Sequence, residues 1–430
     1  MKEKLNEEFI KKLSEKKKEP AWMLAHRLKA YHNFLKQKEP NFGPDIHINF
    51  DEICYYKDKT KKMTDKWERV SCNLKNTFDD LGVIKAEEEY LGGVTNQYES
   101  EVFYHKQTIG NGIIFTSTDE ALQKYPKLFQ KYFNNLVKLE ENKYTALNNA
   151  VWSGGSFIYI PKGVKVDKPL QSYFRIESES LGQFEHTIII VDDGADLSYI
   201  EGCTATAYSK TSLHAGVVEI YVGKNAKCRY STIQNWSTDV YNLVTKRAIV
   251  DDGGLMEWVD GNIGSGLTMK YPSCILKGTG ARGNSISVAY AKKGQVLDAG
   301  AKMIHLGQNT KSSIISKSIA EAGGIANYRG TTRITKEATD SVATIKCDTI
   351  LLDDISKSDT FPKNIVGNKT SSLTHEATVS KLDADKLFYL TSKGLSEDQA
   401  RELLIMGFMI DFKKELPMEY AVELNRLIKE

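Results

Sequence analysis

The chain is 430 residues long, and its 58 lysines and arginines nearly balance its 56 aspartates and glutamates, leaving a formal net charge of +2. This balance argues against nucleic acid and against an anionic membrane as partners. No apolar run is long enough to span a bilayer, no signal-peptide core is present, and the six cysteines form no C-x-x-C pair, so we expect a soluble, cytoplasmic protein without a disulfide framework.

The first 150 residues are expected to form a helical and mixed region. Leu24, Leu28, Tyr31 and Leu35 follow the spacing of an amphipathic helix. A second helix is predicted to begin at Ser117, where Ser-x-x-Glu forms a capping box, and to run to about residue 139.

Residues 151–380 have a different character, because short strand-like runs alternate with small or polar turns and no helical pattern intervenes. The turn signals recur at intervals close to multiples of 14 to 15 residues, at Gly194, Asn225, Gly253, Gly294, Asn309, Gly323 and Ala338. This regularity predicts a mainly β protein built as a parallel β-helix, or solenoid. A β-sandwich is the alternative, but it normally closes within about 100 residues.

Residues 381–430 are predicted to be helical again. Ser396-x-x-Gln399 is a second capping box, and Pro417 stands where a last helix would begin. We expect these helices to cover the open end of the solenoid and to offer a docking surface.

Two glycine patterns bear on nucleotide chemistry. The segment Gly278–Gly283 matches G-x-G-x-x-G, but a strand-like run follows it where a dinucleotide site requires a helix. No G-x-x-x-x-G-K-[ST] occurs, so any ATP hydrolysis must come from a partner.

Cys347, His375 and Glu376 are the candidate chemical centre. Cys347 and His375 are 28 residues apart, so neighbouring turns of a solenoid could bring them together. Thiol, imidazole and carboxylate suit metal ligation, and the same three groups could form a nucleophile with its base. Taken alone, Cys347 also fits a buried core thiol, and we find no oxyanion hole or strand–turn–helix elbow for a hydrolase.

Gln234 and Trp236 interrupt a strand-like run with polar groups. An inward Gln234 would be costly unless it is hydrogen-bonded or lines a channel, and an outward turn is the alternative.

Seven motifs resemble a known family: Trp236, Thr245–Arg247, Lys270–Gly278, Thr310–Ala320, Tyr328–Gly330, Lys346–Leu352 and Leu373–Thr378. They are similar to SufB of the SufB/SufD family, the scaffold of the Suf iron–sulfur cluster assembly machinery. The resemblance implies a right-handed parallel β-helix with helical ends. It also implies a non-enzymatic scaffold, which accepts sulfur and assembles a transient iron–sulfur cluster for transfer to apo-proteins.

The resemblance also implies roles for individual residues. Cys347 corresponds to the essential sulfur acceptor and cluster anchor, and His375 and Glu376 to cluster ligands at an interface with a SufD-like paralogue or a second copy. A sulfur-transfer path inside the helix is assigned to Cys203, Arg175, Gln234, Trp236 and Lys246. Further implied partners are a SufC-type ABC ATPase on the C-terminal helices and a cysteine desulfurase, and the complex can bind reduced flavin.

Two other interpretations remain open. In a SufD-like structural partner, Cys347 would be dispensable. A β-helix hydrolase or lyase acting on polysaccharide would usually bring a secretion signal and clustered carboxylates, and the sequence shows neither.

Overall fold

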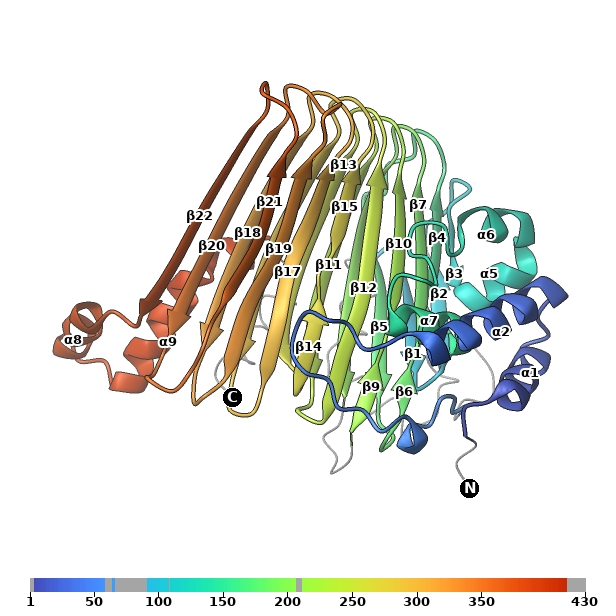
Figure 1. Cartoon of the computed structure of the whole chain (residues 1–430), viewed down its shortest axis with the longest axis horizontal. Helices are drawn as coiled ribbons and strands as arrows, with labels where there is room; N and C mark the ends of the chain where they lie inside the picture. The colour runs from blue at the N-terminus through green and yellow to red at the C-terminus, as the bar shows by residue number, and fades with distance from the viewer. Residues whose placement is uncertain (1–3, 59–63, 66–90, 108, 206–210, 416–430) are drawn as a thin grey trace.

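The computed structural model describes residues 4–58, 64–65, 91–107, 109–205 and 211–415. Its main body is a β-solenoid of about eight turns, as predicted, in which two sheets face each other across a common core (Figure 1). Nearly all neighbouring strands are parallel; the pairs β1–β2 and β3–β4 are antiparallel.

The first sheet contains ten strands. In spatial order they are β2 (Glu101–Gln107), β1 (Gly93–Tyr98), β5 (Leu170–Ile176), β8 (Asp196–Ala205), β11 (Lys227–Trp236), β13 (Leu255–Gly264), β16 (Arg282–Ala291), β18 (Lys311–Ala320), β20 (Val342–Leu351) and β22 (Ser372–Lys381).

The second sheet contains twelve strands. Its main order is β21 (Thr360–Val366), β19 (Ile325–Ile334), β17 (Val296–His305), β14 (Leu267–Lys270), β12 (Val240–Val250), β10 (Val217–Val222), β7 (His186–Val191), β4 (Ser156–Ile160) and β3 (Ile114–Ser117). Three short strands complete it: β6 (Gly182–Gln183), β9 (Ser212–His214) and β15 (Ser273–Leu276).

The predicted turns are found at the corners between the sheets. Gly194, Asn225, Gly253 and Asn309 all have positive φ, a conformation that glycine and asparagine adopt more readily than other residues. The G-x-G-x-x-G segment also lies at a corner, and β16 follows it, which confirms that it does not open a helix.

Strand alternation places every second side chain inside the solenoid. Aliphatic and aromatic residues of both sheets form the principal core there, for example Ile220, Tyr230 and Trp258. Burial of each such side chain stabilises the fold by about 1.5–3 kcal/mol.

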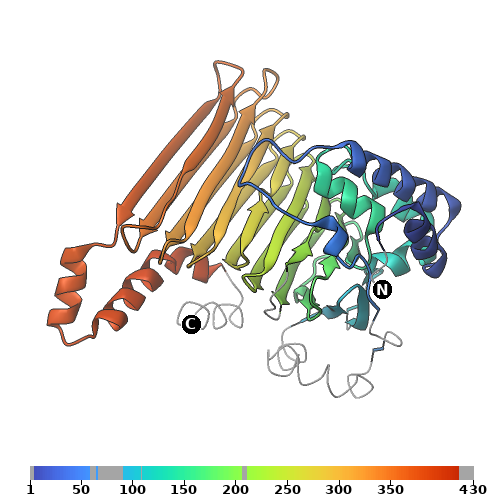
Figure 2. The same ribbon diagram turned by 60° about the horizontal axis from the view of Figure 1, so that its bottom comes forward.

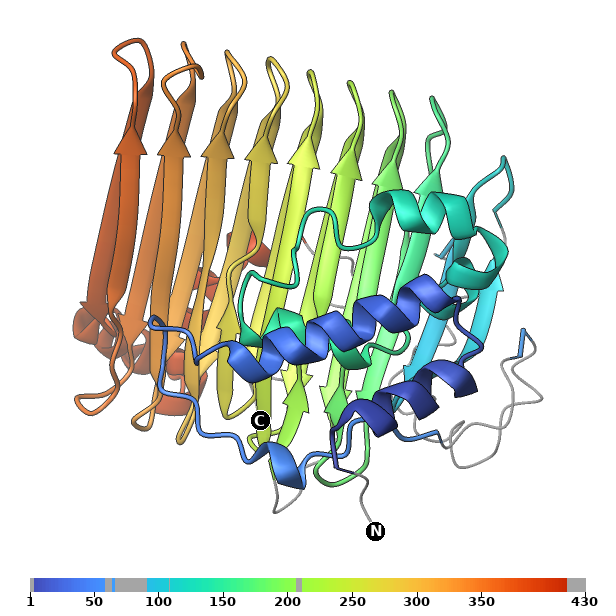
Figure 3. The same ribbon diagram turned by 45° about the vertical axis from the view of Figure 1, so that its right-hand side comes forward.

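N-terminal helices cover the outer face of the second sheet (Figure 3). They are α1 (Glu7–Lys16), α2 (Ala21–Lys36), α5 (Thr118–Lys124), α6 (Pro126–Tyr132) and α7 (Lys143–Val151), with a short 3₁₀ helix, η1 (Phe50–Glu52). Ser117 caps α5 as predicted. However, the single helix expected from residue 117 to 139 is wrong: it breaks at Tyr125, because Pro126 starts a new helix and disfavours helical backbone before it.

The C-terminal helices α8 (Ala384–Ser392), α9 (Glu397–Phe408) and α10 (Ile410–Lys414) follow the last strand. The Ser396–Gln399 capping box is confirmed, whereas Pro417 lies outside the described residues. The expected cover over the open end is wrong. Helices α9 and α10 lie instead along the outer face of the first sheet (Figure 2). Ile405, Met409 and Phe412 pack there, because that face carries an apolar patch from β11 to β18.

Within the described part of the chain, none of the helices combines the length and the apolar character that crossing a bilayer requires.

Candidate functional site

Cys347 lies inside the solenoid near its C-terminal end. Alternation along β20 turns it inward with Ala343 and Ile345, and it is only 4% exposed. Tyr328, from β19 of the second sheet, presents its hydroxyl to the thiol. Burial raises the pKa of Cys347 to about 12, and the nearby Tyr328 hydroxyl, which makes no other hydrogen bond within the described residues, opposes this rise. The group is therefore a protonated thiol at neutral pH.

His375 lies on the next strand, β22, on the same inner face. It pairs in register with Ile345, while Ala377 is the residue opposite Cys347. Its Nδ1 is 3.2 Å from the Asn364 side-chain amide, and its Nε2 is buried with no hydrogen-bond partner within the described residues. Burial lowers the pKa of His375, which favours a neutral imidazole. Because the Asn364 amide donates to Nδ1, the ring proton lies on Nε2, and Nε2 must lose it before it can bind a metal.

Glu376 points the other way. As the neighbour of His375 on a strand it belongs to the outer face, where it pairs in register with Lys346. Lys346 also faces outward, 4.0 Å from Asp348, so its charge is not directed at the Cys347 thiol. In the regions that the structure describes, no three His, Cys, Asp or Glu side chains are grouped so that they could hold a metal ion.

A column of polar side chains leads through the interior to Cys347. One register position of the first sheet carries a hydroxyl or carboxylate in seven successive strands from β1 to β18, and Cys347 follows in β20. The seven residues are Thr95, Ser172, Glu201, Thr232, Asp260, Ser287 and Ser316. An interior made of aliphatic ladders would need none of them.

Hydrogen bonds connect parts of this column. The Thr95 and Ser172 hydroxyls are 2.6 Å apart, Thr232 donates to Asp260, and the Ser287 hydroxyl donates to Ser316 at 3.3 Å. The second carboxylate oxygen of Asp260 is buried without a partner among the described residues. Such an atom calls for an ordered water or a polar ligand inside the solenoid.

Two buried ion pairs face the column from the second sheet. Lys246 Nζ is 3.2 Å from Glu201 Oε1, and Lys270 Nζ is 3.0 Å from Asp260 Oδ1. Burial acts to lower the pKa of Lys246, but the Glu201 and Asp260 carboxylates outweigh it and raise that pKa. For Lys270 burial prevails and the pKa is lowered. The interior therefore holds fixed charges of both signs close to the middle of the solenoid.

Four of the five predicted path residues meet in this region. Cys203 on β8 and Gln234 on β11 are register neighbours, both inward and buried. The Gln234 side-chain oxygen accepts from Asn242 at 2.8 Å and from Lys270 at 3.2 Å, so the inward, hydrogen-bonded alternative is the one observed. The Trp236 ring lies 4.7 Å from that of His214.

Arg175 is placed differently. On β5 it follows Phe174, the register partner of Cys203, so alternation turns it to the outer face, where it lies 3.5 Å from Glu177. Burial raises the pKa of Cys203 well above its usual value. Five strand steps separate β8 from β20, so Cys203 and Cys347 are roughly 24 Å apart and cannot exchange sulfur directly.

Sequence reasoning missed Tyr328, Glu201, Asp260 and Lys270 as parts of this interior. The signal was present: from Glu201 to Cys347 the column residues recur at offsets of 27 to 31 residues. Aligning the strands at that spacing would have placed Glu201 and Asp260 in the column that ends at Cys347.

Comparison with known proteins agrees with this architecture. The model of the SUF system FeS cluster assembly SufBD core domain matches residues 174–408, and that of the SufBD protein N-terminal region matches residues 4–172. Three iron–sulfur cluster assembly SufBD family proteins are similar over 99% of this chain and 92% of their own length. They come from Staphylococcus saprophyticus (54% identity), Staphylococcus haemolyticus (54%) and Staphylococcus aureus (55%). The chain belongs to the SufBD family of iron–sulfur cluster assembly proteins.

Proposed function

We propose that this chain is a SufB-type scaffold, in which Cys347 accepts sulfur and anchors a nascent iron–sulfur cluster. The observation that carries the proposal is the polar column, because its hydroxyls and carboxylates lead through the interior of the solenoid and end at this thiol. A structural subunit would gain nothing from such a column, since burying polar groups and charges is costly.

The interior would serve as the sulfur-transfer path. Cys203, Gln234, Trp236 and Lys246 lie at its middle, and the hydrogen-bonding groups beyond them can stabilise a small polar sulfur species. The separation of roughly 24 Å requires a carrier that moves between the two cysteines. Arg175, on the outer face, would act at the entrance of this path or through Glu177.

At Cys347 the thiol must lose its proton before it can attack sulfur or bind iron. The Tyr328 hydroxyl would stabilise the thiolate, and entry of water or of a partner would lower the cost of the charge. His375, on the same inner face, supplies a neutral imidazole as a second ligand. Glu376 lies on the outer face, so it would become a cluster ligand only if β22 rearranged or if the cluster were shared with a partner chain at the interface.

A partner chain would complete the site. β22 and β21 are the last strands of their sheets among the described residues, and most of their side chains are exposed. A SufD-like paralogue or a second copy of this chain would add its own strands at this end. Exposed Phe388, Tyr389 and Leu403 on the C-terminal helices suit docking of a SufC-type ABC ATPase, and a cysteine desulfurase would supply sulfur.

Anaerobic reconstitution with iron and sulfide tests the proposal, with visible absorbance and bound iron as readouts. Cys347→Ser should take up far less cluster than the wild type. Cys228→Ser is the matched control, because Cys228 is an equally buried thiol of the same interior, on β11 away from the column's end. Equal uptake by the Cys347→Ser protein would contradict the scaffold role and favour a SufD-like structural subunit.

A further inference from the structure

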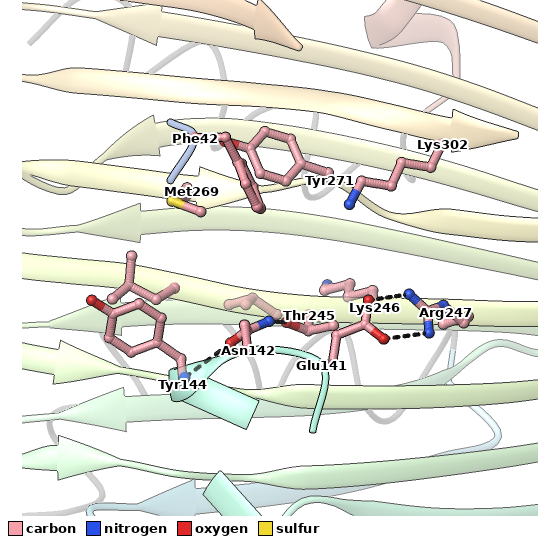
Figure 4. Close-up of a pocket in the computed structure, with 12 residues that line it drawn as sticks. Phe42, Glu141, Asn142, Tyr144, Thr245, Lys246, Arg247, Met269, Tyr271 and Lys302 are labelled. Atoms are coloured by element: carbon pink, nitrogen blue, oxygen red, sulfur yellow. Dashed lines mark hydrogen bonds and ion pairs between the residues drawn. The ribbon is translucent and has the colours of Figure 1, made fainter. Parts of the chain in front are cut away.

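A cavity of about 140 Å³ lies on the outer face of the second sheet, apart from the interior that holds Cys347 (Figure 4). Phe42, Met269 and Tyr271 line one side, and Glu141, Asn142 and Tyr144 line the other. The N-terminal segment that carries Phe42 thus closes a space over β12 and β14.

The charges around this cavity do not balance. Arg247 is neutralised, because its guanidinium pairs with both carboxylate oxygens of Glu141 and donates to the Leu136 carbonyl at 2.9 Å. Lys302 lines the same cavity, and no carboxylate within the described residues lies at ion-pair distance from its ammonium. Burial lowers the pKa of Lys302, and the Glu141 carboxylate offsets this only in part. One cationic group therefore remains without an anionic partner.

Aromatic rings flank that ammonium. It lies 5.7 Å from the ring centroid of Phe42 and 5.5 Å from that of Tyr271, and the two rings are 6.1 Å apart at 53°. The Tyr271 hydroxyl donates to Asp298 at 2.7 Å, which fixes this ring.

The turn at Gly43 holds Phe42 in place. Gly43 has φ +87°, a conformation that strains any other residue, and a Cβ there would come within 2.9 Å of the Met269 sulfur. Phe42 is nevertheless 41% exposed, which places an aromatic face at the mouth of the cavity.

We infer that this cavity binds a small aromatic monocarboxylate, with the carboxylate paired to Lys302 and the ring packed beside Phe42 and Tyr271. One unpaired cation selects a monoanion, and the flanking rings select a flat apolar body. Pockets for drug-sized ligands start at roughly 300 Å³, so a cavity of about 140 Å³ accepts a single ring. This inference is independent of the proposed scaffold function.

Benzoate is the probe for this site, with benzyl alcohol as its neutral counterpart, in calorimetric titrations of the full chain. Benzoate should bind saturably and benzyl alcohol at least about tenfold more weakly, since a hydrogen bond to a charged group contributes about 1.5–3 kcal/mol. Lys302→Met should weaken benzoate binding by a similar factor, and Lys302→Arg should retain most of it. Lys293→Met, at an exposed corner, is the matched control and should bind like the wild type.

The outcomes separate clearly. Phe42→Ala should weaken the binding of benzoate but leave the binding of acetate unchanged. Equal binding of benzoate by wild type and Lys302→Met, or equal binding of benzoate and benzyl alcohol, would overturn the inference. So would acetate or inorganic phosphate binding as tightly as benzoate, because that pattern describes a plain anion patch without a ring site.

Discussion

Two opposing effects set the pKa of the Cys347 thiol: its burial and the nearby Tyr328 hydroxyl. Burial stabilises the neutral thiol, whereas the Tyr328 hydroxyl favours the thiolate, and the net pKa of about 12 shows that burial dominates. The absence of a side chain at Gly330 leaves room for the Tyr328 hydroxyl, because a Cβ there would lie 2.3 Å from its oxygen. Tyr328 is therefore a positioning residue for the thiol.

Tyr328→Phe should slow alkylation of Cys347 by iodoacetamide about fivefold at fixed pH, the effect of losing roughly 1 kcal/mol of hydrogen bonding to the thiolate. Gly330→Ala should act in the same direction by displacing the hydroxyl. The measurement is the pH dependence of the alkylation rate by mass spectrometry, in which the apparent pKa of the thiol should rise. Tyr290→Phe, whose hydroxyl instead donates to Glu321, is the control. An unchanged rate in both Tyr328→Phe and Gly330→Ala would exclude the positioning role.

The facing strands β8 and β12 are joined inside the solenoid by charge. Glu201 and Lys246 are each no more than 2% exposed, so each depends on the other to be tolerated as an ion. Removal of one charge leaves the other buried without a counterion, while neutralising both leaves no buried ion in need of a partner. The single variant should therefore be much less stable than the double variant.

Lys246→Met should lower the free energy of unfolding by about 3–5 kcal/mol in urea titrations, because Glu201 would stay buried and unpaired. Adding Glu201→Gln should restore most of this loss. The same substitution at Lys224, in an exposed pair with Asp252, should change stability by less than about 1 kcal/mol. A double variant as unstable as Lys246→Met would show that the pair is not the source of the effect.

Another buried ion pair contains a histidine: His214 on β9, whose Nε2 lies 2.7 Å from Glu185. Burial acts to lower the pKa of His214, but the Glu185 carboxylate outweighs it and the pKa is raised above 6.5. A group with a raised pKa contributes its full stability below the unfolded value and loses it as pH rises through the folded value. The difference in unfolding free energy between wild type and His214→Gln should therefore shrink as pH rises above about 6.5. A difference that stays constant from pH 6 to 9 would contradict this.

Among the described residues, β22 forms a free edge of the first sheet at the C-terminal end of the solenoid. At the start of β22 the Ser372 amide donates to the Ser341 carbonyl, and just after its end the Leu382 amide donates to the Leu351 carbonyl of β20. Even-numbered amides of β22 therefore face β20, and odd-numbered amides face the free edge. A partner of the same fold could continue the sheet there through main-chain hydrogen bonds.

Ala377→Pro should abolish association at this edge without loss of thermal stability, because proline removes an amide that faces outward and leaves the bonds to β20 intact. Thr378→Pro is the matched comparison, since it removes an amide that faces β20 and should lower the melting temperature. Size-exclusion chromatography with light scattering, on the chain alone and with a SufD-like partner, gives the readout. Unimpaired association of a folded Ala377→Pro protein would rule out pairing through β22.

The architecture was predictable because turns and alternation are local properties of the chain. Glycine and asparagine marked the corners, and period-two patterns marked the strands. Alternation also implied that His375 and Glu376, being adjacent, face opposite sides, a point that grouping them as one ligand set overlooked. What remained hidden depends on register between distant strands, as for Tyr328 and Cys347, or on the choice of face for a helix, as for α9.

The repeated register of the coils limits which insertions and deletions the chain can accept. Because successive strands repeat the same register, the span between Cys203 and Cys347 alters only in whole steps of about 4.8 Å, one for each coil gained or lost. Deletion of a full coil would shorten the route while keeping every inward residue inward. Deletion of a single residue within a strand would turn the rest of that strand inside out. Variation among such chains should therefore accumulate at the corners and in coil number, with strand lengths held constant.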